Sequence, residues 1–474
     1  MSTSLIITLL ILLSLATWLA FKRSTTALYV VIFLAPWEGL DIDVGLRLTA
    51  YQIFLAPLVL VMLLRLALRN SATHSPFVPN TLILFALFAA LSSFLRIPFL
   101  PVPLVEVSGG ALRGPEARAM IQIAMFVFVI SPVLIAPFVL RRPEQLMVAA
   151  KTYLLSLVVL AAIGWFQLLV WYGTENNPIP IGFVDVLLGG TAREREGYYG
   201  FIDLLIYRMN SFGGEPKNLG SAFVIGMLII QALLTTAKRP LSGKLMYLWG
   251  FLAFSTLATL STTAFFLWAI GTVMLVVAPY LFHLRHEQIK ATGFRRLGIL
   301  LLLIVLIVAG AEVADVPLGE ILVDRTVTRV AESQFGVFED FDDAILDYLF
   351  DHPSSAITGV GLGNAHLYAD PYLAPEIADF TGGGVFVAKA QYLRLISEVG
   401  IIGLGLFLVW YLKLISSTSV RLRTTAAMAN FAPLVTFGFA NLFVFMAAGA
   451  SAAQFYITAG VISAAYVMCN NSNK

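Results

Sequence analysis

Residues 262–282 of the chain read TTAFFLWAIGTVMLVVAPYLF and contain no charged side chain. A basic run, residues 283–296, follows them directly. A membrane-spanning helix needs about 20 mostly apolar residues, because the hydrocarbon core of a bilayer is about 30 Å thick. Lys and Arg gather in cytoplasmic loops. This stretch therefore predicts a transmembrane helix that ends on the cytoplasmic side.

Apolar runs of similar length recur throughout the chain. They lie at 4–21, 26–40, 50–68, 80–97, 119–140, 146–172, 217–237, 244–260, 262–282, 297–313, 391–412, 424–448 and 450–468. Hydrophobic residues make up 59% of the 474 residues and charged residues only 12%, whereas about 25% is usual in a soluble domain. We therefore expect an all-α, polytopic membrane protein with about 12–13 transmembrane helices, in which residues 1–474 form a single integral membrane domain. Only Ser261 separates two of the runs, which are either two helices in a tight hairpin or one long broken helix.

Basic residues predict the orientation of these helices. They fall in alternate loops, at Lys22 and Arg23, Arg65 and Arg69, Arg141 and Arg142, Lys238 to Lys244, 283–296, and Lys413 to Arg423. Because cytoplasmic loops carry an excess of Lys and Arg, we expect all of these loops in the cytoplasm. The loops 98–118, 173–216 and 314–390 are then extracytoplasmic, and 314–390 is a large loop before the last three helices.

Charges are scarce inside the predicted helices. The exceptions lie at or near helix ends, at Arg96, Glu312, Arg394 and Glu398. Transporters and pumps usually place ionisable groups at mid-membrane instead. The net charge of +2 gives no indication of nucleic acid binding, and the single cysteine, Cys469, excludes a disulfide framework. We therefore expect the chemistry at the outer membrane–water boundary, in and under the two longest extracytoplasmic loops.

The loop 173–216 leads into the stretch RMNSFGGEPKNLG, residues 208–220. Pro216 suits the first turn of the following helix, and the two glycines before it allow the chain to fold over. Arg208 and Glu215 are thereby held at the outer end of a helix, where they are candidate site residues. The alternative is a capped helix whose interfacial charges reach out to water.

The loop 314–390 is too long to be a bare connector. Arg325 and Arg329 are four residues apart and so share a helix face. Residues 338–351 combine apolar side chains at helical spacing with six acids, which predicts an amphipathic helix on the outer surface. Its acidic face is either solvated or a metal site, and the spacing does not fit a calcium-binding loop.

Two further stretches near the end of this loop contain candidate site residues. Residues 359–366 read GVGLGNAH; the glycines allow the backbone to approach a substrate closely, and His366 is either a base or a surface histidine. The last stretch opens a transmembrane helix, in which Lys389 and Tyr392 lie on or near one face. Arg394 is four residues from an acid on the same helix, so the two can pair.

The stretches 208–220, 351–364 and 389–405 together resemble motifs of the O-antigen ligase/polymerase superfamily of bacterial surface-polysaccharide enzymes. They are similar to its Arg, Gly-rich turn and Glu-Pro segment, its acid-His-Pro and Gly-x-Gly-x-Gly-Asn segment, and its Tyr-Leu-x-x-Leu-x-Glu-x-Gly-x-x-Gly helix. The large outer loop is similar as well. The family's ligases have a histidine where this chain has Lys389. Arg394, which precedes Gly405, resembles the start of an Arg-and-Gly motif of the polymerases.

The resemblance implies a glycosyltransferase of the bacterial cell inner membrane whose active site faces the periplasm. It implies a polymerase of undecaprenyl diphosphate-linked oligosaccharide repeat units for an exopolysaccharide or O-antigen, without cofactor or metal. The implied partners are the lipid bilayer, a chain-length regulator or co-polymerase, and export machinery. The alternatives are an O-antigen ligase that transfers polymer to an acceptor such as lipid A–core, a transporter or flippase of lipid-linked sugars, and a non-catalytic component of an export complex.

Diphosphate chemistry assigns expected roles to the candidate residues. A lipid diphosphate leaving group needs fixed cations, and arginine pairs with phosphate oxygens in a bidentate way. The catalytic candidates are Arg208, Glu215, Lys389 and His366. The substrate-binding candidates are Arg325, Arg329, Asn364, Tyr392 and Arg394. Lys389 is either a base, which would require a lowered pKa, or a clamp for the diphosphate, and we favour the clamp.

Overall fold

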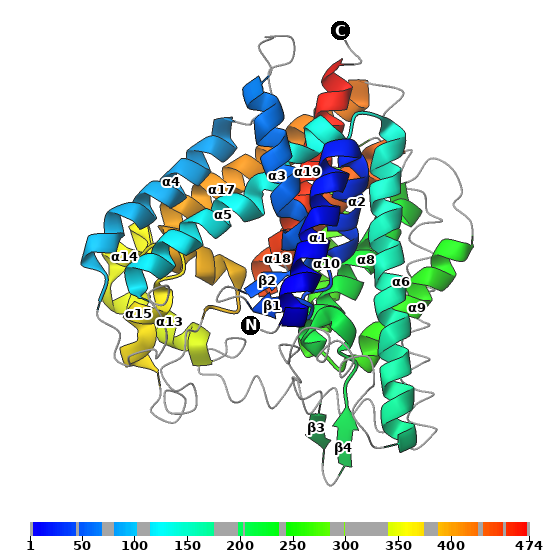
Figure 1. The fold of residues 1–474 in the computed structure, drawn as a ribbon, viewed down its shortest axis with the longest axis horizontal. Coiled ribbons are helices and arrows are strands. Elements are labelled where there is room, and N and C mark those ends of the chain that lie inside the picture. Colours follow the sequence, from blue (N-terminus) through cyan, green and yellow to red (C-terminus); the bar gives the residue numbers. More distant parts are fainter. Residues whose placement is uncertain are drawn as a thin grey trace.

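The chain folds into a bundle of long apolar helices (Figure 1). The structure, a computed structural model, describes residues 3–43, 47–68, 80–101, 114–174, 198–201, 204–236, 243–284, 298, 340–373, 387–424, 430–448 and 452–471. Among them, eight helices are long and apolar enough to cross a membrane, and four shorter apolar helices accompany them. The expected all-α, polytopic membrane fold is confirmed.

The helices follow the apolar runs of the sequence closely. The twelve apolar helices are α1 (Thr3–Lys22), α2 (Ser24–Leu34), α3 (Ala50–Leu68), α4 (Asn80–Arg96), α5 (Pro115–Val139), α6 (Pro143–Thr174), α8 (Pro216–Thr236), α9 (Lys244–Ala258), α10 (Thr262–Leu281), α17 (Gln391–Thr424), α18 (Ala432–Ala448) and α19 (Ala452–Asn471). The predicted run 297–313 lies outside the described residues. The two predicted runs that Ser261 separates form two helices, α9 and α10. Ser261 caps α10 by accepting a hydrogen bond from the backbone N–H of Ala264.

Short elements join these helices. Two antiparallel hairpins consist of β1 (Asp41–Asp43) with β2 (Arg47–Thr49), and of β3 (Tyr198–Phe201) with β4 (Leu204–Tyr207). The predicted amphipathic helix is present as α13, and further short helices lie in the two site loops and beside α4. These elements are α13 (Asp340–Asp351), α14 (Pro353–Thr358), α15 (Ala365–Ala369), η1 (Ile97–Phe99), η3 (Ser211–Gly213) and η5 (Asp370–Tyr372).

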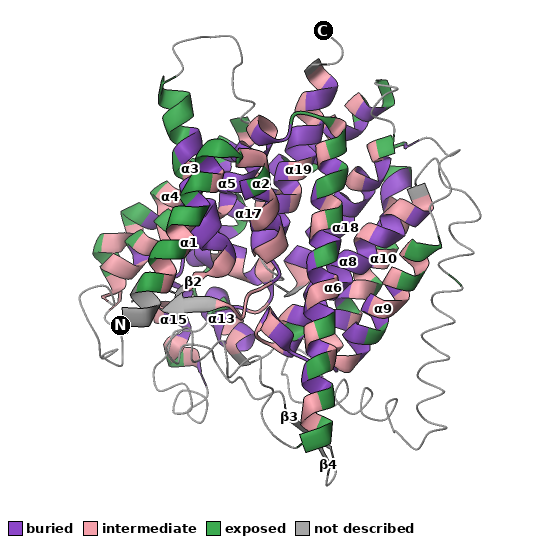
Figure 2. Ribbon diagram, turned by 45° about the vertical axis from the view of Figure 1, so that its right-hand side comes forward, coloured by how far each residue is buried: buried purple, intermediate pink, exposed green. Residues whose placement is uncertain are grey.

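Aromatic side chains fill the centre of the bundle where α17, α18 and α19 meet. Phe445 and Phe455 stack with their ring centroids 4.1 Å apart, and Tyr411 lies 4.7 Å from Phe455. Trp410 is fully buried beside them. Outward-facing side chains are also apolar, and Leu68, Leu87 and Leu169 among others are exposed (Figure 2). A buried aromatic core with an apolar exterior fits a bilayer as the solvent.

The short elements and the C-terminus lie at opposite ends of the bundle (Figure 1). Helices α13, α14 and α15 and the β3–β4 hairpin gather at one end, called the loop end below. The C-terminus lies at the other, called the C-terminal end. The basic residues that follow α1, end α3 and precede α6 line one common pocket, with Lys22, Arg65 and Arg141 among them. Three of the predicted basic loops therefore share one side, as their alternation requires.

Reporter fusions test the orientation. We expect alkaline phosphatase fused at Glu194 or Asp343 to be active, because both positions belong to loops that alternate with the basic ones and export is required for that enzyme's activity. A fusion at Arg142 is the control and should be inactive. The measurement is enzymatic activity normalised to fusion protein in the membrane, and the reverse pattern would overturn the assigned sidedness.

Candidate functional site

Helix α17 breaks at Gly400, near the loop end. Gly400 has φ 75° and ψ 174°, so the helix hydrogen bonds are interrupted there. The carbonyl oxygens of Ser397 and Glu398 accept hydrogen bonds from the backbone N–H groups of Val360 and Gly361, at 2.8 and 2.9 Å. A Cβ atom at Gly400 would lie 2.2 Å from the carbonyl oxygen of Ile357. The break therefore requires a glycine and supplies the docking edge for the glycine-rich loop.

The glycine-rich loop 359–364 is wedged between helices. Its three glycines have φ values of 76°, 96° and 72°, a region that residues with a Cβ rarely adopt. A Cβ at Gly363 would lie 2.5 Å from the side chain of Gln122 on α5. The backbone N–H of Leu362 donates to Ser93 Oγ of α4 at 2.9 Å. The glycines thus bring the loop backbone close to α4, α5 and α17, while the predicted approach to a substrate stays a prediction.

A cluster of ionisable side chains lies beside this loop; we call it the arginine cluster, and it consists of Arg118, Arg394, Glu398 and His366. Arg394 Nε donates to Glu398 Oε1 at 3.0 Å, and the Glu398 side chain is only 6% exposed. Arg118 of α5 interacts electrostatically with Glu398 and Arg394, and with His366. One carboxylate therefore pairs with Arg394 and interacts electrostatically with Arg118, so the two guanidinium groups leave the cluster with excess positive charge.

His366 is buried on α15 and stays neutral. Burial lowers its pKa to about 4, with the positive charge of Arg118 as the second cause. Asn364, at the end of the glycine-rich loop, is fully buried. Neither side chain is on the open surface, so the interpretation of His366 as a surface histidine is wrong. A neutral imidazole beside arginines can accept or donate a hydrogen bond, but it stores a proton poorly.

Asp342 brings the two long loops together. Its carboxylate accepts hydrogen bonds from the backbone N–H groups of Lys389, at 2.6 Å, and of Ala390, at 3.1 Å, and so caps the start of α17 from α13. Lys217 of α8 interacts with the same carboxylate, and its Nζ lies 3.3 Å from Glu215 Oε2. The residues Glu215, Lys217, Asp342 and Lys389 form what we call the capping cluster.

Lys389 lies in the capping cluster as a half-buried cation. Its Nζ is 5.4 Å from the centroid of the Phe341 ring, a distance at which an aromatic face attracts a cation. Tyr392, one turn further along α17, interacts with Asp342. Lys389 lies just before α17, which begins at Gln391, whereas Arg394 and Glu398 lie on the first turns of that helix. The capping cluster thus lies at the start of α17, and the arginine cluster includes residues of its first turns.

The other candidate residues are placed less directly. Arg208 is half-buried between β4 and η3, and its neighbour Met209 donates from its backbone N–H to the carbonyl of Ala258 at 3.0 Å. Ser211 donates in the same way to Gln167 Oε1 at 2.7 Å. The stretch before α8 is therefore tied to α6 and α9. Arg325 and Arg329 lie outside the described residues.

Four members of the clusters are absent from the candidate residues of the sequence, namely Arg118, Glu398, Lys217 and Asp342. Arg118 could have been found, because it directly precedes the predicted run 119–140 at its outer end. Asp342 could not have been singled out among six neighbouring acids, because its partners are 47 and 48 residues away in the chain. Among the described residues, no three His, Cys, Asp or Glu side chains are placed to hold one metal ion.

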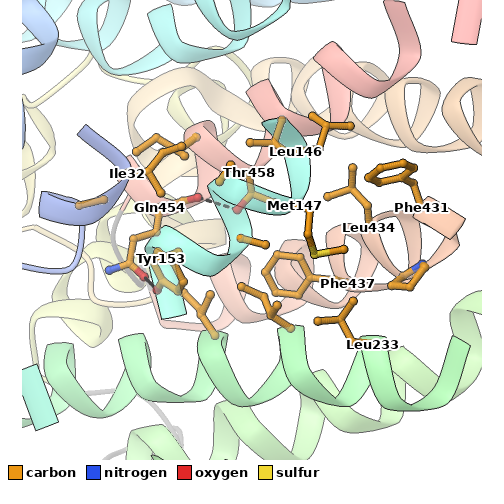
Figure 3. A pocket seen from close by; sticks show the side chains of 18 of the residues that line it. Ile32, Leu146, Met147, Tyr153, Leu233, Phe431, Leu434, Phe437, Gln454 and Thr458 are labelled. Atoms are coloured by element: carbon orange, nitrogen blue, oxygen red, sulfur yellow. Dashed lines mark hydrogen bonds between the residues drawn. The ribbon is translucent and has the colours of Figure 1, made fainter. Parts of the chain in front are cut away.

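An apolar groove lies elsewhere, between α2, α6, α8, α18 and α19 (Figure 3). Mostly aliphatic and aromatic side chains form its walls, and its cavity volume is about 100 Å³. One hydrogen bond, from Tyr153 Oη to Gln454 Oε1 at 2.7 Å, crosses it at one end. The groove could receive an aliphatic chain, but none of the candidate site residues of the sequence lines it.

Comparisons with known proteins identify no relative of the chain, so the geometry alone is the basis for interpreting the site. No protein-family model matches the chain, and no curated protein matches it.

Substitution of the glycine at the helix break tests the docking of the loop. We expect Gly400→Ala to lower the unfolding temperature strongly or to abolish accumulation, because its Cβ would clash with Ile357 and its φ is left-handed. Gly405→Ala is the matched control. No atom lies within 4 Å of a Cβ at Gly405, and Ala in a helix interior is about 0.5–1 kcal/mol more favourable than Gly. Equal unfolding temperatures would contradict the described packing.

The protonation of Asp342 gives a pH-dependent signature. Burial raises the pKa of this carboxyl to about 6, although the two backbone N–H groups oppose the shift. The folded chain therefore binds more protons than the unfolded chain between about pH 4 and pH 6, and this contribution to stability falls as the pH rises through that window. Asp342→Asn removes the titration. We expect the difference in unfolding temperature, wild type minus variant, to decrease between about pH 4 and pH 6; a constant difference would contradict the assignment.

Proposed function

We propose that the chain is a glycosyltransferase that polymerises undecaprenyl diphosphate-linked oligosaccharides at the periplasmic face of a bacterial inner membrane. The observation that carries the proposal is the pair of clusters at the start of α17. Arg394 pairs there with the buried carboxylate of Glu398, Arg118 interacts electrostatically with both, and Lys389 lies in the capping cluster just before the helix. Excess fixed positive charge at a membrane boundary suits a diphosphate on a lipid.

The reaction would exchange one bond at the anomeric carbon. A hydroxyl oxygen of the acceptor sugar forms a bond to the anomeric carbon of the donor, while the bond from that carbon to the diphosphate oxygen breaks. The diphosphate leaves on its lipid with the electron pair, and the proton of the hydroxyl goes to a base. Because the leaving group gains negative charge in the transition state, preorganised cations stabilise that state more than the substrate.

Roles follow from charge and position. Arg118, Arg394 and Lys389 would hold the diphosphate. Glu215 is the candidate base, because it is a partly exposed carboxylate at the edge of the capping cluster. His366, whose pKa is about 4, would orient the acceptor hydroxyl by a hydrogen bond rather than keep its proton. A ligase would use the same groups with a different acceptor, and a chain-length regulator is an expected partner of the polymerase.

The second candidate is a transporter of lipid-linked sugars. The broken helix α17 favours it, because discontinuous helices with ionisable residues at the break form the substrate sites of many transporters. Arg394 and Glu398 lie directly before the break at Gly400. The assay below separates the two functions, since a transporter moves its substrate without making a new glycosidic bond.

Purified protein with lipid-linked repeat units, and without ATP or nucleotide sugars, tests the proposal. We expect longer glycans on the lipid carrier. We expect Arg118→Ala and Arg394→Ala to lower the rate by about 100-fold or more, since loss of one stabilising contact to developing charge typically costs a few kcal/mol. Arg208→Ala should also remove most product. Arg421→Ala, on the last turn of α17, is the control and should retain full rate. Translocation without longer glycans would establish the transporter instead.

Substitutions of Lys389 distinguish a clamp from a base. If a permanent charge holds the diphosphate, Lys389→Arg retains measurable activity and Lys389→Ala loses nearly all of it. Lys389→His should be poor at about pH 8 and better at about pH 6, because histidine titrates near 6.5 and lysine near 10.4. If the residue is a base, arginine cannot replace it, because arginine does not deprotonate in proteins. Glycan length is the measurement, and a fully active Lys389→Ala would remove this residue from the site.

A further inference from the structure

A basic pocket lies at the other end of the bundle from the two clusters. It opens where α1 meets α2, where α3 ends and where α5 meets α6, and its cavity volume is about 590 Å³. Five cations line it, namely Lys22, Arg23, Arg65, Arg141 and Arg142, together with three hydroxyl side chains and Gln145. No acidic residue is part of its lining.

Two of the arginines are held in place by neutral oxygen atoms. Arg65 Nη1 donates to Ser24 Oγ at 2.9 Å, and its Nη2 donates to the carbonyl of Phe21 at 2.7 Å. Arg141 Nε donates to the carbonyl of Phe138 at 3.0 Å. These contacts fix the guanidinium groups without neutralising them. Among the described residues, none of the five cations forms an ion pair.

The floor of the pocket is fixed in a similar way. Gln145 Oε1 accepts hydrogen bonds from the backbone N–H groups of Arg141, at 2.6 Å, and Arg142, at 2.9 Å, and so caps the start of α6. Thr25 Oγ1 donates to the carbonyl of Val139 at 3.4 Å. Helix α2 is thereby tied to the turn between α5 and α6, and the cations converge on a preformed hollow.

The orientation of the helices in the membrane does not explain why the five cations surround one pocket. Orientation of the helices needs only Lys and Arg in the loops, whereas here they surround one concavity and repel each other at short range. A bound anion would relieve that repulsion. Arginine presents paired N–H groups that match phosphate oxygens, so phosphate is the anion that best fits the pocket.

The apolar part of the lining indicates where the phosphate comes from. Met62, Leu66, Phe138 and Val139 line the pocket beside the charges, and exposed apolar side chains continue from it along α3. A free phosphate would gain nothing from this surface, whereas the glycerol and first methylenes of a lipid would cover it. We propose that the pocket binds the headgroup of an anionic phospholipid, independently of the proposed glycosyl transfer.

Neutralisation of two cations tests this site. The full chain is purified in a non-ionic detergent, and its unfolding temperature is followed as phosphatidylglycerol is added, which gives an apparent affinity by linkage. The test variant is Arg23→Gln/Arg142→Gln, because neither side chain takes part in the hydrogen bonds that fix the pocket. The matched control is Lys413→Gln/Arg421→Gln, which removes two cations outside the pocket.

We expect phosphatidylglycerol to stabilise the wild type and the control equally, and to bind the test variant roughly 30-fold more weakly, since each cation near a lipid headgroup contributes about five-fold. Arg23→Lys/Arg142→Lys should recover most of the affinity. Phosphatidylcholine and sodium phosphate should stabilise none of the proteins at the same concentrations. Equal affinity of test variant and control would overturn the proposal, and so would sodium phosphate acting as strongly as the lipid, because the site would then bind free anions.

A second measurement tests the proposal on the wild type alone, in case the test variant inserts poorly into the membrane. Native mass spectrometry of the wild type, released from bilayers of phosphatidylglycerol and phosphatidylcholine, counts the lipids that remain bound. We expect retained phosphatidylglycerol that is lost as the salt concentration rises, because the contact is electrostatic. Equal retention of both lipids at all salt concentrations would also overturn the proposal.

Discussion

The break of α17 at Gly400 is the constraint on which the loop end of the molecule depends. A helix in a bilayer cannot leave backbone groups unsatisfied, so irregular backbone persists only where protein supplies partners. Here the backbone of Val360 and Gly361 supplies them to Ser397 and Glu398. These hydrogen bonds place the glycine-rich loop against α4, α5 and α17. The break separates a short helix that starts at Gln391 from the long membrane-spanning part.

Both clusters take their positions from this short helix. Asp342 fixes its first N–H groups from α13, and Lys217 brings α8 to the same carboxylate. One turn later, Arg394 holds Glu398 within the bundle and near Arg118. Arg394 is thus paired with the buried Glu398, and Asp342 is held by two backbone N–H groups. Such fixed positive charge would require little reorganisation if an anionic transition state formed there, which is the physical argument for the proposed glycosyl transfer.

The sequence predicted the membrane-spanning segments well because apolar length and basic loops act locally, and each run from 4–21 to 450–468 that the structure describes became a helix. It also identified the glycines, since Gly359, Gly361 and Gly363 all have left-handed φ values. It predicted neither the break at Gly400 nor the cap by Asp342. Both depend on contacts between segments roughly 40 residues or more apart, and no periodicity in a single sequence specifies such contacts.

The cations at the two ends of the bundle have different partners. Those at the loop end lie near carboxylates, and those at the C-terminal end contact neutral oxygen atoms. At the loop end, Glu398 and Asp342 partly neutralise the arginines and lysines, so that an anion binding there would compete with fixed carboxylates. At the C-terminal end, the described cations around Arg65 and Arg141 are fixed by neutral oxygens alone. Coulomb attraction to an anion is strongest without a competing carboxylate. A partly compensated site suits turnover, and an uncompensated one suits an anion that stays bound.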